Sequence, residues 1–206
     1  PKNYGEVCLN AEDFGLSPEN PDNQKALNSA IEKCKEVKAS KLQVQKGIYH
    51  SNSDEALTFE GFKDFEFDGG GSTFIFLKKK GTLFKITNGE RMLFRNLNID
   101  WNWEKDPLAS VVELVELAPD KSYMDFRFVD YKDFPNKSTR FAFLDMLDPE
   151  TLSVGSEGGF GLSLEFTKGK NKPDTEWLSG NMLRIKASKS NNPLREEKLK
   201  KGQLFR

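Results

Sequence analysis

The chain has 206 residues, a mass of 23.4 kDa and nearly balanced charge, with 31 Lys and Arg against 32 Asp and Glu. A formal net charge of −1 disfavours a nucleic-acid-binding protein, which usually carries a strong basic excess. No apolar run reaches the length of a membrane-spanning helix. The aromatic residues are mostly phenylalanine, 17 in number, which favours strands that bury a large ring at alternate positions.

The counts of cysteine and histidine limit the chemistry. Cys8 and Cys34 are the cysteines and His50 is the single histidine, which excludes a disulfide-dense scaffold, an all-cysteine zinc site and a multi-histidine metal site. The same counts disfavour Ser-His-Asp and Cys-His mechanisms, so carboxylates are the candidates for catalysis. We expect no metal and no cofactor. Cys34 as a buried free thiol and a disulfide between Cys8 and Cys34 both stay open.

The first predicted element is an amphipathic helix. Asn20 supplies an N-cap and Pro21 suits the first helical position. Apolar residues then recur at three- and four-residue spacing, which predicts a helix of about four turns that covers a hydrophobic surface. The residues of this stripe are Ala26, Leu27, Ala30, Ile31, Cys34 and Val37.

After the helix the apolar period changes to two, which predicts short strands separated by turns, one of them at Asp68–Gly71. The apolar residues also repeat when the chain is shifted by 27 residues. A repeat of short strands at this period indicates a β-solenoid, whose coils stack on one another and whose end the helix would cap. The matched pairs are Leu57 with Phe84, Phe59 with Ile86, Phe65 with Met92, and Phe67 with Phe94.

The second half lacks this repeat, which predicts a separate domain. We place the boundary near residues 104–107, giving a domain of residues 1–103 and another of residues 104–206. Longer, irregularly connected strands favour an antiparallel barrel or sandwich in the second domain. The predicted strands include 109–117 and 122–131, the apolar residues Phe141, Phe143, Leu162, Leu164, Phe166, Leu183 and Ile185, and turns at 148–150, 155–161 and 168–174.

Several segments in residues 11–101 resemble the opening sequence of the pectate-lyase-like, right-handed parallel β-helix superfamily. This resemblance implies an all-β fold with an N-terminal capping helix, a polysaccharide or oligosaccharide partner, and a secreted or periplasmic location. Lys46 stands where the superfamily usually has proline, and the threonine at its helix start is missing here. The segments that carry the resemblance are 11–16, 20–27, 42–49, 67–72 and 94–100.

A finer resemblance links Asp100-Trp101 and Asp106-Pro107-Leu108 to glycoside hydrolase family 110, in which a β-barrel is inserted into the β-helix. It implies that residues 104–206 are the insertion, truncated at its end. It also implies a glycoside hydrolase rather than a polysaccharide lyase, with catalytic carboxylates beyond residue 206 and an inactive fragment. The alternatives are a structural β-helix of the phage tailspike type and a carbohydrate-binding module without catalysis.

The cluster most typical of a sugar site is Asp100, Trp101 and Trp103, because tryptophan rings stack on pyranose faces and carboxylates bind hydroxyl groups. We predict these three residues as substrate-binding, against the alternative that both tryptophans wedge between the two domains. Other residues near the coil edges are candidates with structural alternatives: Asp68 as a turn former, Arg91 and Arg95 as ligands of acidic sugars or as solvated residues. The remaining carboxylates there are Asp64, Glu104 and Asp106.

A solenoid that stops after its first coils exposes an apolar end, formed here by Leu93, Phe94, Leu97 and Ile99. Burying one such side chain contributes roughly 1.5–3 kcal/mol, so uncovered ones are costly. We therefore expect either residues 104–206 or a second copy of the chain, in a homo-oligomer, to cover this end.

Overall fold

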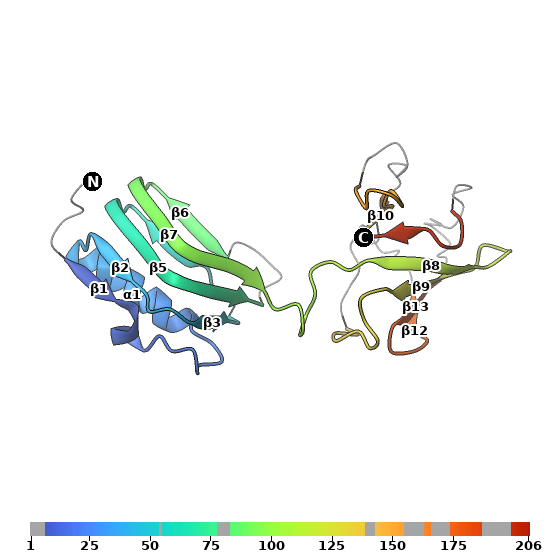
Figure 1. The fold of residues 1–206 in the computed structure, drawn as a ribbon, viewed down its shortest axis with the longest axis horizontal. Coiled ribbons are helices and arrows are strands. Elements are labelled where there is room, and N and C mark those ends of the chain that lie inside the picture. The colour runs from blue at the N-terminus through green and yellow to red at the C-terminus, as the bar shows by residue number, and fades with distance from the viewer. Residues whose placement is uncertain are drawn as a thin grey trace. The chain divides into compact units, whose positions relative to one another are not determined.

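The structure is a computed structural model and consists mostly of strands with one α-helix, as expected for an all-β protein with an N-terminal helix (Figure 1). The chain divides into two compact units, Pro1–Trp103 and Glu104–Arg206, which we describe separately. The structure describes residues 7–53, 55–77, 83–138, 143–154, 163–165, 174–186 and 199–206.

Helix α1, Gln24–Val37, is the amphipathic helix that the apolar stripe predicts. It begins later than expected, since neither Asn20 nor Pro21 lies in its first turn. Asp22 instead accepts a hydrogen bond of 3.0 Å from the backbone N–H of Gln24, which satisfies one of the free donors at the helix start. Val37 is partly exposed, whereas the buried apolar residues of the stripe are Leu27, Ala30, Ile31 and Cys34.

Parallel strands build the rest of the first unit. One sheet has the order β1-β2-β5-β3, with β7 also paired to β5, and a second sheet joins β4 to β6. The four apolar pairs predicted from the 27-residue shift are confirmed as partners in these ladders. The elements are β1 Cys8–Asn10, the 3-10 turn Ala11–Phe14, β2 Lys41–Gln43, β3 Ile48–Ser51, β4 Leu57–Glu60, β5 Lys63–Phe76, β6 Phe84–Thr87 and β7 Glu90–Trp101.

Strand β5 runs through the segment Asp68–Gly71, so the prediction of a turn between two strands is wrong there. The register between β5 and β7 shifts between Asp68 and Ser72, which makes the glycines a bulge within one strand. Gly70 has a φ of 62°, and a Cβ added to it would lie 2.1 Å from the carbonyl oxygen of Val44. The backbone near Val44 approaches Gly70 so closely that only glycine fits at this position.

The inward side chains of β6 and β7 are less buried than their partners on β4 and β5. Ile86 is 50% exposed and Ile99 is 53% exposed, and Phe94 is partly buried. Leu93 does not belong to this apolar end, contrary to expectation, because it pairs with Glu66 and alternates with Phe94, so it lies on the opposite face of the sheet. The buried partners on β4 and β5 are Leu57, Phe59, Phe65, Phe67 and Phe74.

The second unit is antiparallel. One sheet has the order β12-β13-β9-β8-β14, and β10 pairs with β11. Strand β8 begins at Val112 rather than at residue 109. Phe141, Leu162, Phe166, residues 155–161 and residues 168–173 lie outside the described residues. The strands are β8 Val112–Leu117, β9 Tyr123–Phe128, β10 Phe143–Asp145, β11 Ser163–Glu165, β12 Thr175–Trp177, β13 Met182–Lys186 and β14 Leu204–Phe205.

The first and last strands of the second unit are neighbours. Leu204 pairs with Glu113 and Phe205 with Val112 in an antiparallel ladder. The first and last described strands of this unit therefore lie side by side.

Candidate functional site

The predicted cluster at the end of β7 is organised around one carboxylate. Oδ1 of Asp100 accepts hydrogen bonds from the backbone N–H of Trp101 at 2.7 Å and from Nε1 of Trp103 at 3.0 Å. These two bonds lower the pKa of Asp100 below its usual value, in that order of importance. The carboxylate is therefore ionised at neutral pH and holds the Trp103 indole in place.

The two tryptophans of this cluster have different surroundings. Trp101 is 6% exposed and packs in the core of the first unit, whereas Trp103 is 43% exposed. The structure thus brings Asp100 and Trp103 together and buries the Trp101 ring. Of the two rings, Trp103 is the one that can meet a sugar, and its role in binding stays a prediction.

The other candidate charges near the strand ends have different partners. Nε and Nη2 of Arg91 bind the two oxygens of Asp64 at 2.5 and 2.6 Å, and Arg91 also contacts Glu90. The hydrogen bonds that Arg91 donates to Asp64 are the main reason that the pKa of Arg91 is raised. Asp106 accepts a hydrogen bond of 2.7 Å from Nδ2 of Asn136. Glu104 is exposed.

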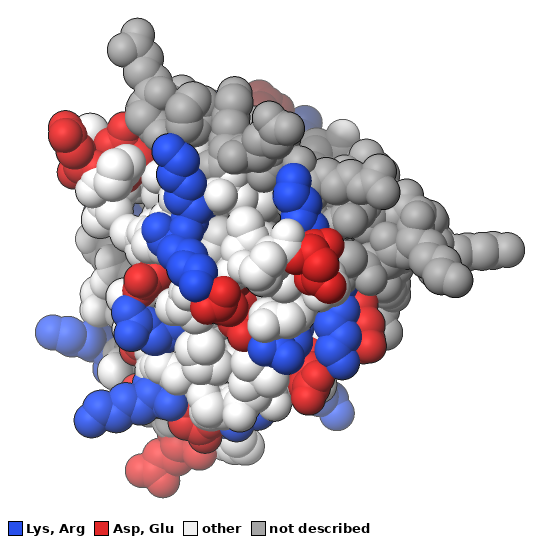
Figure 2. Space-filling view, turned by 90° about the vertical axis from the view of Figure 1, so that its right-hand side faces the viewer, with Lys and Arg blue, Asp and Glu red and all other residues white. Residues whose placement is uncertain are grey.

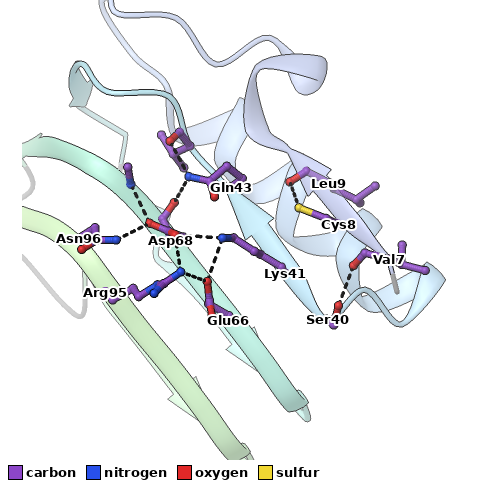
Figure 3. Close-up of polar contacts among 12 residues, drawn as sticks. Val7, Cys8, Leu9, Ser40, Lys41, Gln43, Glu66, Asp68, Arg95 and Asn96 are labelled. Atoms are coloured by element: carbon purple, nitrogen blue, oxygen red, sulfur yellow. Dashed lines mark hydrogen bonds and ion pairs between the residues drawn. The ribbon is translucent and has the colours of Figure 1, made fainter. Parts of the chain in front are cut away.

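Sequence reasoning missed a second cluster, which joins three neighbouring strands on the outer face of the sheet (Figure 3). Nζ of Lys41 on β2 lies 3.0 Å from both Glu66 and Asp68 on β5. Nη2 of Arg95 on β7 lies 2.8 Å from Glu66 and 3.0 Å from Asp68. Two cations and two carboxylates therefore compensate one another across β2, β5 and β7.

Asp68 is the centre of this cluster, with only 7% of its side chain exposed. Its Oδ1 accepts hydrogen bonds from Nδ2 of Asn96 at 2.9 Å and from the backbone N–H of Gly70 at 3.1 Å, while its Oδ2 faces Lys41 and Arg95. Burial alone would raise the pKa of Asp68, but the hydrogen bonds from Asn96, Lys41 and Gly70 outweigh it and hold the pKa well below the usual value. Contrary to expectation, Asp68 therefore does not close a turn between two strands but lies within β5 and joins it to β2 and β7.

The sequence contained a signal for this cluster. Lys41, Asp68 and Arg95 are spaced by 27 residues, the same shift that pairs the apolar residues. Opposite charges that recur at the 27-residue period are expected to meet on neighbouring strands. Applying the shift to charged residues as well as to apolar ones would have predicted the contacts.

A polar groove of about 590 Å³ adjoins the cluster. It lies beside the β5 bulge and is lined by residues of β2, β5 and β7. Its lining residues are Gln43, Asp68, Gly70, Gly71, Asn96, Leu97 and Asn98.

Three general observations concern metal binding, membrane crossing and surface charge. Within the part of the chain that the structure describes, no group of three or more His, Cys, Asp or Glu residues could hold a metal ion. No helix among the described residues is long and apolar enough to cross a membrane. On the face drawn in Figure 2, acidic and basic side chains of the described residues are interspersed, with no broad area of one sign.

Comparison with known proteins gives one distant relative. The chain is 33% identical to alpha-1,3-galactosidase B of Parabacteroides distasonis over 129 residues, an alignment that covers 50% of this chain and 20% of that protein. The chain thus spans about a fifth of the length of this relative. No protein-family model matches the chain.

Proposed function

We propose that the chain is part of a secreted or periplasmic carbohydrate-active enzyme of the glycoside hydrolase class. The observation that carries this proposal is the similarity to a galactosidase. Since the alignment covers a fifth of that relative, the proposal concerns the longer protein to which such a chain would belong. Its partner would be a polysaccharide or an oligosaccharide.

The proposal includes the fold. Residues 1–103 would be the helix cap and the first coils of a right-handed parallel β-helix. Three features support it. The residues that pair on neighbouring parallel strands are a near-constant number of residues apart in the sequence, and inward phenylalanines stack from strand to strand. Helix α1 also packs beside β1 and β2. Residues 104–206 would be a domain inserted into the β-helix, a proposal supported by the pairing of β14 with β8, which puts the two ends of the unit side by side.

We place the catalytic carboxylates of the enzyme outside residues 1–206. Glycoside hydrolysis needs one carboxyl group free to donate a proton and a second free to act as base or nucleophile. In the first unit, Asp64, Glu66 and Asp68 instead face arginine or lysine at ion-pair distance, and Asp100 holds an indole. These four carboxylates are thus already engaged by a cation or an indole, which suits a structural role.

Hydrolysis assays test the proposal directly. The 206-residue chain and the longer natural protein would each be incubated with p-nitrophenyl α-galactoside and with α-1,3-galactobiose, and the released sugar measured. We expect cleavage by the longer protein and none by the 206-residue chain. A longer protein that cleaves neither these nor other glycans would contradict the proposal, and one that binds them without turnover would indicate a carbohydrate-binding module.

The half-exposed inward side chains of β6 and β7 favour a second candidate, a structural β-helix that assembles through this apolar end. Ile86 and Ile99 are each at least 50% exposed, although their register partners Phe59 and Phe74 are fully buried. A second copy that covers them would remove this apolar surface from water. Light scattering on the purified chain tests this candidate: a stable trimer supports it, and a monomer at all concentrations contradicts it.

A further inference from the structure

The groove beside the β5 bulge has the features of a ligand site. Its volume of about 590 Å³ lies within the range of small-molecule sites in proteins. Gly71 has a φ of 82°, and a Cβ added to it would meet no atom within 4 Å. The groove is therefore open at Gly71, and its floor there is backbone without a side chain.

Carboxamide groups supply the polar surface of the groove. Nδ2 of Asn96 donates to Asp68 and Nε2 of Gln43 donates to the carbonyl oxygen of Val44, so in both side chains the amide oxygen is left to accept. The Asn98 amide is exposed and makes no side-chain hydrogen bond with the described residues. The groove thus offers two fixed acceptors and one amide that can both donate and accept.

The charges next to the groove select against an ionic ligand. Lys41 and Arg95 already face Glu66 and Asp68 at 2.8–3.0 Å, so two carboxylates already compensate the two positive charges (Figure 3). An anionic ligand would have to displace one of these carboxylates. A cationic ligand would find in Asp68 a carboxylate whose two oxygens already accept four contacts.

We propose that this groove binds the hydroxyl groups of a neutral carbohydrate. A sugar hydroxyl both donates and accepts a hydrogen bond, and a carboxamide is an uncharged side chain that can match both functions at once. Asp68 acts here as a positioning residue, since its hydrogen bond to Asn96 turns the Asn96 amide oxygen away from Asp68. The carbohydrate class rests on the proposed function, whereas the place of binding and the preference for a neutral sugar come from the groove.

Calorimetric titration of the 206-residue chain tests the proposal, with α-1,3-galactobiose as the neutral probe and digalacturonate as the anionic one. We expect measurable binding of galactobiose and at least tenfold weaker binding of digalacturonate. The double variant Gln43→Ala/Asn98→Ala should weaken galactobiose binding at least tenfold. Asn28→Ala, which removes a carboxamide of α1 that donates to Glu55 and does not line the groove, is the matched control and should bind like the parent chain.

The outcomes separate this proposal from the proposed enzyme activity. No binding of galactobiose, equal binding of both probes, or full binding by a double variant with an unchanged circular dichroism spectrum each overturns the groove assignment. If the longer protein lacks galactosidase activity but the groove variant loses binding, the groove assignment is supported and the proposed enzyme class is contradicted. If the longer protein cleaves galactosides while the groove variant still binds them, the groove assignment is contradicted and the proposed enzyme class is supported.

Discussion

Strands β5 and β7 pair side by side on both sides of the β5 bulge (Figure 1). The inward positions are nevertheless buried on β5 and partly open on β7. Phe67 is 1% exposed while its partner Phe94 is only partly buried, and Phe74 is fully buried while its partner Ile99 is 53% exposed. The side chains are similar in chemistry. What differs is that β5 has β2 and β3 on one side and β7 on the other, whereas among the described residues β7 pairs with β5 alone. Burial in this unit therefore depends on a neighbour on both sides of a strand.

The first prediction compares the loss of stability when alanine replaces each of the two phenylalanines that pair across these strands. Phe67→Ala should lower the free energy of unfolding by about 4 kcal/mol, because it leaves a cavity in a closed core. Phe94→Ala should cost about half as much, because part of this ring already meets solvent. Urea denaturation of both variants measures the difference. Equal losses would show that β7 is as well covered as β5.

Removing the carboxylate that joins the three strands should come next. Asp68→Ala leaves Lys41 and Arg95 without one of their anions and Asn96 without its acceptor, so we expect a loss of about 3 kcal/mol in the free energy of unfolding. The control is Glu36→Ala, which removes an exposed helix pair with Lys33 and should cost less than about 0.5 kcal/mol. Similar losses in the two variants would mean that the Asp68 contacts contribute no more than a surface ion pair.

The same residue predicts a dependence of stability on pH. The pKa of Asp68 is lower in the folded chain than its unfolded value of about 3.9, so its contribution is fully present above that value and is lost as the pH falls through the folded pKa. The gap in unfolding free energy between the parent chain and Asp68→Ala should therefore be constant above about pH 5 and narrow below about pH 4. Urea denaturation at a series of pH values measures it, and a gap that widens in acid would contradict the assignment.

A charge at the open end of β7 should cost little stability. Ile99→Lys should lower the free energy of unfolding by less than about 1 kcal/mol, since the side chain is already half exposed. If a second copy covers this face, the variant should also reduce the apparent mass in light scattering. Phe74→Lys, at the register partner, should prevent folding because it buries an unpaired charge. A large loss of stability in Ile99→Lys without any change of mass would show that this position is covered within the monomer.

The smallest effect concerns the two thiols, which are both free in the structure. Burial, with a smaller contribution from the nearby Cys8, raises the pKa of Cys34 to about 12, whereas Cys8 is exposed. In the folded chain an aromatic disulfide reagent should therefore modify one thiol quickly and the second only on unfolding. Cys8→Ser should abolish the fast reaction. A fast reaction that survives this substitution would contradict the burial of Cys34.

Much of the first unit follows from local pattern. The stripe from Leu27 to Cys34 predicts α1, and the 27-residue shift predicts the pairing of Phe65 with Met92 and of Phe67 with Phe94. These features are predictable because each repeats at the period of its element, so a few residues specify where the apolar side lies. The antiparallel pairing in the second unit was also predictable, because its longer strands lack the 27-residue repeat of the first unit.

The sequence by itself determined the strand repeat and the amphipathic helix, and it placed Asp100 near Trp103, although not the burial of Trp101. Only the tertiary structure decided that Asp68–Gly71 continues a strand, because the bulge depends on how closely Val44 approaches Gly70, a contact between distant parts of the chain. It also decided that Leu93 faces away from the apolar end. Alternation assigns a residue to one of two faces, and only the pairing with Glu66 shows which face is the outer one.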